Sequence, residues 1–172
     1  MNNHIKNSFG GVYVNIPKIN NLVDDISESQ YEIDYNRKFY LFDVIPVGAV
    51  RMTQSDKWKT NPFHIDPKKQ QRKSVTKYFE FKNKIQAQSL EMNYQLQNIL
   101  DIVFLVPMPF TWSEKKKVKN NKKPCKTRPD IDNYVKAFMD AFTIDDAFVW
   151  KITAEKRYSF KGSILVYENY NK

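Results

Sequence analysis

The sequence is poor in the residues that build disulfide frameworks, zinc sites and glycine-rich phosphate loops. Its 172 residues include one cysteine, two histidines and four glycines. The single Cys125 excludes an internal disulfide framework and any zinc site made of cysteines alone. His4 and His64 lie far apart in the chain, so a histidine-based metal site is not expected. With so few glycines, an extended glycine-rich phosphate-binding loop is not expected either.

Long apolar segments are absent as well. No apolar run approaches the roughly 18 residues that span a bilayer, and the first thirty residues lack a basic segment followed by an apolar one. The chain is 41% hydrophobic and 15% aromatic, which suffices for the core of one domain and argues against disorder throughout. We therefore expect a soluble, cytoplasmic, globular protein that does not associate with a membrane.

Positive charge is in excess and unevenly distributed. The chain has 28 Lys and Arg residues against 19 Asp and Glu, a formal net charge of +9. Residues 1–36 contain two basic and five acidic residues, so their net charge is −3 and the remainder of the chain carries +12. We expect an acidic N-terminal extension over 1–36 and one domain over 37–172. An excess of positive charge is compatible with binding to nucleic acids, to acidic membrane surfaces or to acidic proteins, and does not distinguish among them.

Two stretches, residues 51–84 and 113–128, hold most of the basic side chains. Trp58 and Trp112 lie within or beside them, and basic residues interleaved with aromatic ones favour nucleic-acid binding. A solvated surface without a partner is the alternative. The candidate contacts to nucleic acid are Lys57, Lys73, Lys77, Lys115, Lys116, Lys117, Lys119, Lys122, Lys123, Lys126 and Arg128.

Hydrophobic periodicity predicts the order β-α-β-α-β-β. The elements expected are a strand over 37–47, a loop over 48–71, a helix over about 72–98, a strand over 101–107, a loop over 110–128, a helix that begins at Pro129, a strand over 147–158 and a last strand after Gly162. We expect the last two strands to pair as an antiparallel hairpin. This order predicts an α+β (α/β-like) domain with a mixed sheet and two covering helices. A short strand over 11–16 is expected in the extension.

Five carboxylates gather within seventeen residues: Asp130, Asp132, Asp140, Asp145 and Asp146. Clustered carboxylates without histidine or cysteine suit Mg²⁺ or Mn²⁺ rather than zinc. A nearby Lys136 could stabilise negative charge on a reacting phosphate. A structural interpretation stays open, because acids are favoured at a helix N-terminus and Asp132 with Lys136 forms an ordinary helix-surface pair.

The segment RPDIDNYVKAFMDAF (128–142), followed by DDAFV (145–149) and EKRY (155–158), resembles the signature of RusA-type Holliday junction resolvases. The resemblance implies a RusA-like fold in which Asp130, Asp132 and Asp146 bind the metal, with Asp145 beside them, and Lys136 is the catalytic lysine. It further implies a homodimer that needs Mg²⁺, with Mn²⁺ as a substitute, and no small-molecule cofactor. Members of the family cut branched DNA by paired nicks.

One feature departs from the pattern. Only Thr143 and Ile144 separate Phe142 from the Asp145–Asp146 pair, fewer residues than is usual in the family, so either aspartate can be the third ligand. The sequence thus predicts a Mg²⁺-dependent, structure-selective DNA endonuclease acting on four-way junctions in a bacterial or phage-infected cell. The alternatives are a basic DNA-binding module without catalytic activity, and a metal-dependent nuclease of forks, flaps or single strands.

Overall fold

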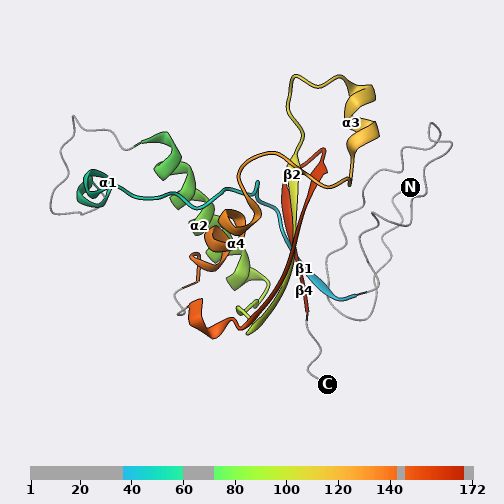
Figure 1. Cartoon of the computed structure of the whole chain (residues 1–172). Helices are drawn as coiled ribbons and strands as arrows, with labels where there is room; N and C mark the ends of the chain where they lie inside the picture. The colour runs from blue at the N-terminus through green and yellow to red at the C-terminus, as the bar shows by residue number, and fades with distance from the viewer. Residues whose placement is uncertain (1–36, 60–71, 143–145, 169–172) are drawn as a thin grey trace. The chain divides into compact units, whose positions relative to one another are not determined.

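Four strands form one mixed sheet in the computed structural model, which describes residues 37–59, 72–142 and 146–168. The strands are β1 (Phe39–Phe42), β2 (Ile99–Pro107), β3 (Lys151–Ser159) and β4 (Ser163–Tyr167), in the sheet order β1-β4-β2-β3. Strand β4 runs antiparallel to both β1 and β2, whereas β2 and β3 are parallel (Figure 1). The predicted α+β class with a mixed sheet is confirmed. The predicted extension 1–36 and its strand over 11–16 lie outside the described residues.

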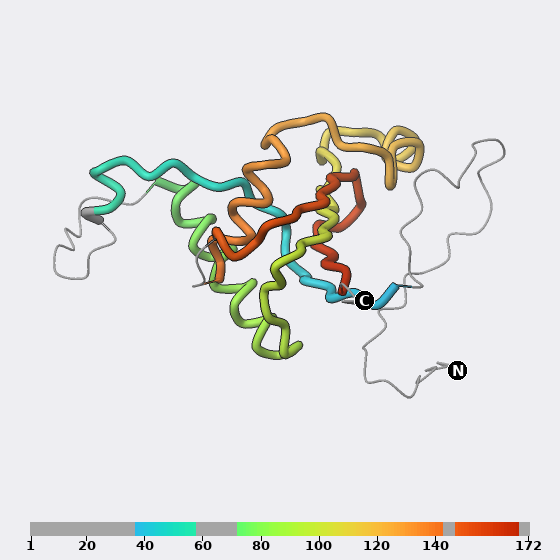
Figure 2. The backbone as a smooth tube through the Cα atoms, turned by 60° about the horizontal axis from the view of Figure 1, so that its bottom comes forward, coloured from blue at the N-terminus to red at the C-terminus, as the bar shows by residue number. Residues whose placement is uncertain are grey.

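Within the described residues, four α-helices and one 3-10 helix accompany the sheet. They are α1 (Gln54–Lys59), α2 (Lys73–Glu91), α3 (Glu114–Asn120), α4 (Ile131–Met139) and the 3-10 helix η3 (Asp146–Phe148). Helices α2 and α4 lie on the same side of the sheet (Figures 1 and 2). None of the helices in the described ranges is long and apolar enough to cross a membrane.

The predicted hairpin between the last two strands is wrong, because β2 lies between them. Val103 of β2 is paired with Leu165 of β4 on one side and with Glu155 of β3 on the other. Strand β2 is apolar along most of its length, so a central position with a strand on each side buries its side chains. Strand β3 carries charged residues, which suit the edge of a sheet. In the connection between β3 and β4, Gly162 lies so close to Ile45 that a Cβ atom at residue 162 would stand 2.9 Å from Ile45 Cγ1.

Two helices occupy segments that the sequence predicted to be loops. Helix α1 begins with a reciprocal capping arrangement: Thr53 N donates to Asp56 Oδ2 at 2.8 Å, and Asp56 N donates to Thr53 Oγ1 at 3.3 Å. Helix α3 is capped by Ser113, whose side chain accepts from Lys116 N, and it carries an acid in its first turn and lysines in its last. These caps are local sequence signals that hydrophobic periodicity does not detect.

Several element ends differ from the prediction. Helix α2 stops at Glu91 rather than near residue 98, because Asn93 adopts a positive φ of 51° and Tyr94 N donates to Ser89 O. Helix α4 begins two residues after Pro129, with Asp130 as its N-cap. The predicted strand 147–158 is replaced at its start by η3, and β1 is shorter than the predicted strand 37–47.

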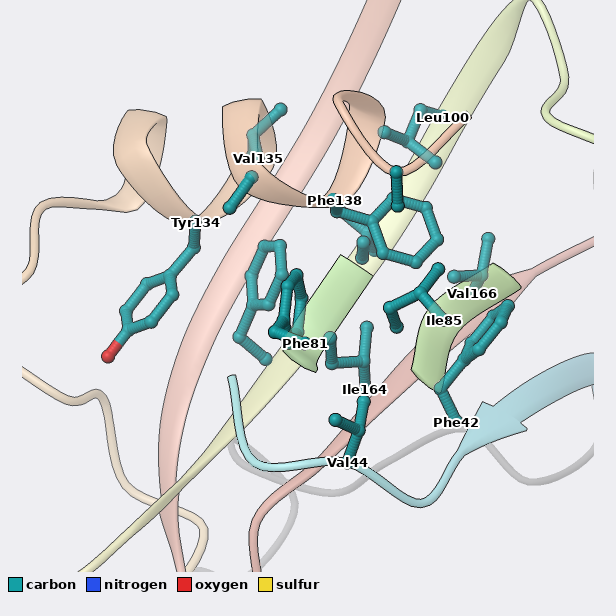
Figure 3. Close-up of a cluster of buried hydrophobic side chains, with 14 of the residues drawn as sticks. Phe42, Val44, Phe81, Ile85, Leu100, Tyr134, Val135, Phe138, Ile164 and Val166 are labelled. Carbon is teal, nitrogen blue, oxygen red and sulfur yellow. The ribbon is translucent and has the colours of Figure 1, made fainter. Parts of the chain in front are cut away.

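The main core lies between the sheet and the two long helices (Figure 3). Phe42 and Phe138 are fully buried and meet edge to face, with ring centroids 5.4 Å apart. Ile85 of α2 and Ile164 of β4 are also fully buried in this cluster. The apolar stripe predicted on α4 therefore faces the core, which leaves the flank with Asp132 and Lys136 exposed.

Candidate active site

The two aspartates of the Asp-x-Asp motif lie at the N-terminal end of α4. Asp130 is the N-cap residue with extended backbone angles, and its side chain makes no capping hydrogen bond. Asp132 lies in the first helical turn, and both residues are exposed. The positive end of the helix dipole favours negative charge at this end. Asp130 and Asp132 therefore form a pair of exposed carboxylates at the start of α4, and the N-cap residue Asp130 makes no side-chain hydrogen bond to the helix.

The backbone before and after these aspartates is held by the segment that follows β1. Gly48 lies so close to Pro129 that a Cβ atom at residue 48 would stand 2.8 Å from Pro129 Cβ. The next residue, Ala49, donates its N–H to Asn133 O at 2.9 Å. The backbone carbonyl of Asn133 therefore ties the first turn of α4 to the segment after β1. The Arg128–Pro129 peptide bond that precedes Asp130 is cis.

Helix α4 is anchored to the sheet by Tyr134. Its ring stacks on Phe104 of β2 with a centroid distance of 5.3 Å and an interplanar angle of 24°. Burial, together with the neighbouring Cys125, raises the pKa of Tyr134 to about 12. Tyr134 is thus a neutral core residue, and its packing fixes the turn of α4 that carries the exposed aspartates.

Lys136 belongs to a network on the flank of α4. Its ammonium lies 3.5 Å from Asp140 Oδ1, one turn further along the helix. Asp140 Oδ2 in turn accepts a hydrogen bond of 2.5 Å from the hydroxyl of Tyr78 on α2. Burial and this carboxylate raise the pKa of Tyr78, so the hydroxyl stays protonated and donates. The contact with Tyr78 could not be predicted from sequence, because the two residues are distant in the chain.

The second pair of predicted ligands is described only in part. Asp146 is the first residue of η3, whereas Asp145 lies outside the described residues. Within the ranges that the structure describes, no three His, Cys, Asp or Glu side chains group as a metal site would require. Of the predicted ligands, Asp130 and Asp132 thus lie two residues apart at the start of α4, and Asp146 lies in η3.

The predicted basic loop contains α3, which carries Lys115, Lys116, Lys117 and Lys119. The ammonium of Lys116 lies 4.2 Å from the centroid of the Trp112 ring, and Trp112 packs on Tyr158 of β3 at 5.2 Å. Lys122, Lys123, Lys126 and Arg128 follow in the irregular segment that leads to α4. Cys125 in that segment is buried beside Met108 and Tyr158.

The other predicted contacts lie on α1 and α2. Lys57 is in α1, and Lys73 and Lys77 are in the first turns of α2. In both views α1 and the first turns of α2 lie on one side of α4, and the lysine-rich α3 lies on the other (Figures 1 and 2). The elements that carry the predicted basic contacts therefore form two groups, one on each side of α4.

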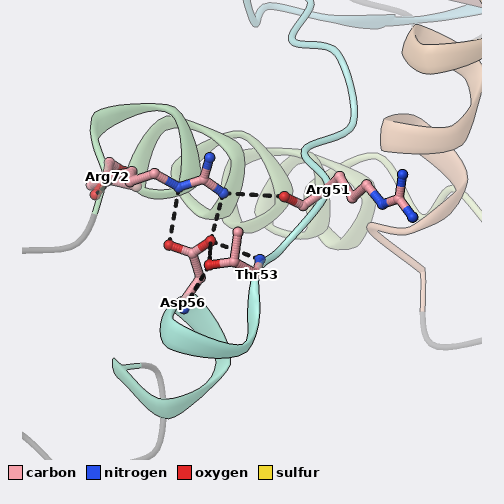
Figure 4. A network of polar contacts seen from close by, with 5 residues as sticks. Arg51, Thr53, Asp56 and Arg72 are labelled. Atoms are coloured by element: carbon pink, nitrogen blue, oxygen red, sulfur yellow. Dashed lines mark hydrogen bonds and ion pairs between the residues drawn. The ribbon is translucent and has the colours of Figure 1, made fainter.

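An ion pair between the buried carboxylate of Asp56 and the half-exposed side chain of Arg72 connects α1 to the start of α2 (Figure 4). Arg72 donates from Nε and from one terminal nitrogen to the two oxygens of Asp56, at 3.1 and 2.5 Å, and also to Arg51 O. The Asp56 side chain is 2% exposed. The Arg72 guanidinium, with hydrogen bonds from Thr53, holds the pKa of Asp56 well below its usual range. This ion pair fixes where α1 stands relative to α2.

Comparisons with known proteins identify the family. Searches of curated proteins and of solved structures found no match to the chain. The family model described as endodeoxyribonuclease RusA matches residues 45–167, which span β2, β3, β4 and every helix described above. The matched range includes the Asp130–Asp132 turn, Lys136 and α3. The chain therefore belongs to the RusA endodeoxyribonuclease family.

Proposed function

We propose that the protein is a Mg²⁺-dependent endonuclease that resolves four-way DNA junctions, or related branched DNA, by paired phosphodiester cleavage. One observation carries the proposal: Asp130 and Asp132 stand exposed at the start of α4, within the family match, and Asp130 does not cap the helix. An N-cap carboxylate that accepts no hydrogen bond from the backbone N–H groups of the helix is available to bind another ligand.

The donor set suits the proposed metal. Both carboxylates are hard oxygen ligands, and Mg²⁺ is commonly bound by one or two carboxylates while it keeps several waters. We propose Asp146 as the third ligand, with Asp145 beside it, and Mn²⁺ as a substitute ion. When bound, the ion supplies an activated water and neutralises charge on the phosphate. No other cofactor is required by this chemistry.

Lys136 is proposed to stabilise the negative charge that develops on the reacting phosphate. It lies one helical turn after Asp132 on the same exposed flank, so both side chains can reach one phosphate group. Its salt bridge to Asp140 keeps the ammonium on this flank. Asp140 itself is directed to Tyr78 and takes no proposed part in binding the metal.

The lysines of α3 and of the segment after it are proposed to bind the phosphates of the DNA. Lys115 and Lys119 are exposed, and α3 precedes the Asp130–Asp132 turn in the chain. Lys57, Lys73 and Lys77, on the other side of α4, are proposed to hold a second arm of the branched substrate. Such contacts position the backbone of the DNA without reading its sequence.

We propose that the enzyme is a homodimer, because two symmetric nicks require two active sites related by a two-fold axis. The edge strand β3 offers a surface for this. Trp150, just before β3, is 68% exposed, and Ile152 within it is 44% exposed. Exposed apolar side chains at an edge are typical of protein interfaces. We place the enzyme in the cytoplasm of a bacterial or phage-infected cell, where its substrate would lie.

A cleavage assay on a labelled mobile four-way junction tests the proposal. With Mg²⁺, the wild type should cut the junction in pairs of nicks, and Asp132→Asn should bind it without cutting. Asp43→Asn is the matched control, since Asp43 is an exposed aspartate paired with Lys161 far from α4 in sequence. Binding without cleavage by the wild type, in Mg²⁺ and in Mn²⁺, would show a DNA-binding module. Equal cutting of forks, flaps or single strands would show a nuclease without junction preference.

A further inference from the structure

Lys156 of β3 is bonded to the backbone on both sides of Pro129. Its ammonium donates to Thr127 O at 2.6 Å and to Pro129 O at 2.7 Å. Pro129 is the residue directly before Asp130, so the second carbonyl belongs to the peptide unit that enters the Asp-x-Asp motif. An ammonium has three N–H groups and no acceptor, and these two carbonyls occupy two of them.

The strand register explains why Lys156 reaches this segment. Lys156 is paired with Phe104 of β2, the residue on which Tyr134 of α4 stacks. The Lys156 ammonium also lies 6.0 Å from the centroid of the Tyr134 ring. In addition, Cys125 N donates to Lys156 O at 2.9 Å, which ties the chain before Thr127 to the same strand. Lys156 therefore lies where β3, α4 and the segment between α3 and α4 meet.

The same turn is also held by Gly48 and Ala49, which contact Pro129 and Asn133. The two sets of contacts differ in kind. Gly48 limits how far Pro129 can move by close approach, whereas Lys156 fixes two carbonyl directions by charge-assisted hydrogen bonds. Together they determine the backbone path from Thr127 to Asn133, and with it the starting points of both aspartate side chains.

We propose that Lys156 is a positioning residue for the metal ligands Asp130 and Asp132. This inference rests on the proposed function, since it assigns Lys156 to the same site. Partners of metal ligands commonly set metal affinity by fixing the ligands' orientation before the ion arrives. The positive charge of Lys156 beside this turn also offsets the repulsion between two carboxylates that are only two residues apart. Lys156 acts through the backbone and is not proposed to touch the DNA.

The experiment compares Lys156→Met with Lys84→Met, which removes the same charge from an exposed position on α2. Binding of Mn²⁺ is measured by calorimetry, and hydrogen exchange is followed at the amides of Asp130, Ile131 and Asp132 in the metal-free protein. We expect Lys156→Met to weaken Mn²⁺ binding by about 10- to 100-fold and to speed exchange at these amides. Lys84→Met should behave as the wild type in both measurements.

Lys156→Arg keeps donors that can reach the carbonyls, so it should recover part of the Mn²⁺ affinity. Affinity of the metal-free protein for junction DNA should change equally in Lys156→Met and Lys84→Met. A larger loss of DNA affinity in Lys156→Met alone, with unchanged Mn²⁺ binding and exchange, would overturn the proposal in favour of a phosphate contact. Loss of folding in both Lys156 variants would also overturn it, since Lys156 would then serve general stability.

These readouts separate the inference from the proposed function. If the wild type binds Mn²⁺ but cuts no DNA, the proposed activity fails while the effect of Lys156→Met on Mn²⁺ still decides the positioning role. If the wild type binds no Mn²⁺, the metal-dependent activity and the role of Lys156 toward a metal both fail. Hydrogen exchange then shows only whether Lys156 orders the turn.

Discussion

The hydroxyl of Tyr78 lies 2.5 Å from Asp140 Oδ2 and joins α2 to the C-terminal end of α4. Tyr78 is 4% exposed, so few waters could replace this bond if it were lost. The same carboxylate is paired with Lys136, which makes Asp140 the link between the core and the proposed catalytic flank.

We expect Tyr78→Phe to lower the free energy of unfolding by about 1–3 kcal/mol, the usual cost of losing a hydrogen bond to a charged group. Tyr94→Phe is the matched control. The Tyr94 hydroxyl is buried and has no hydrogen-bond partner among the described residues, so its removal should be neutral or stabilising. Urea unfolding measures both. Equal effects of the two substitutions would show that the bond to Asp140 contributes nothing.

Stability should depend on pH through Asp56. Its pKa is well below the usual 3.8 in the folded protein, so its contribution to stability is complete above about pH 5 and is lost as the pH falls below 3.8. Asp56→Asn should therefore destabilise the protein most at pH 7, and the difference from wild type should shrink between pH 4 and pH 2. Asp43→Asn, at an exposed ion pair, should change stability little at pH 7. A pH-independent difference for Asp56→Asn would contradict the expectation.

Binding of DNA should weaken with salt through the lysines of α3. Removing two phosphate contacts lowers the slope of log K against log salt by about 2, so Lys115→Gln with Lys119→Gln should give this change on junction DNA. Lys84→Gln with Lys161→Gln removes the same charge at exposed positions outside the proposed surface. Fluorescence anisotropy at several salt concentrations measures both slopes, and similar slopes for the two variants would rule out a specific role for α3.

The oligomeric state should depend on the surface at the start of β3. Replacing Trp150 by Lys places a charge in the proposed interface, and we expect it to shift the protein from dimer to monomer. Leu90→Lys is the control, because Leu90 is 82% exposed on α2, away from the sheet edge. Sedimentation velocity distinguishes the species. A dimer that survives Trp150→Lys would place the interface elsewhere.

Sequence patterns revealed the elements whose own residues decide their structure. The apolar stripe of α4 predicted that Val135 and Phe138 face the core, and the same stripe placed Asp132 and Lys136 on an exposed flank. The motif around Asp130 also led to the family that the comparison shows. These features depend on residues close together in the chain, so hydrophobic periodicity and motif spacing are sufficient to predict them.

Contacts between distant segments could not be predicted in this way. The alternation of residues 147–158 indicates a strand but does not say which strand it pairs with, so β2 was not expected between β3 and β4. The hydrogen bond from Tyr78 to Asp140 joins residues 62 positions apart. Neither a tyrosine nor an aspartate in the sequence indicates which distant residue it will contact. Helix α1 was missed for a different reason: it is too short for periodicity, and only its Thr53–Asp56 cap signals it.

The parallel pairing of β2 with β3 has a consequence for how this protein can vary. Residues 108–150 connect two adjacent strands and contain α3, the Asp130–Asp132 turn and Lys136. The ends of this connection are fixed by the ladder, where Pro107 pairs with Ser159 and Ile99 with Lys151. If α3 holds DNA as proposed, a change in its charge alters DNA binding while the β2–β3 ladder keeps its register. The proposed catalytic residues and the proposed DNA contacts of α3 thus share one continuous connection between two paired strands.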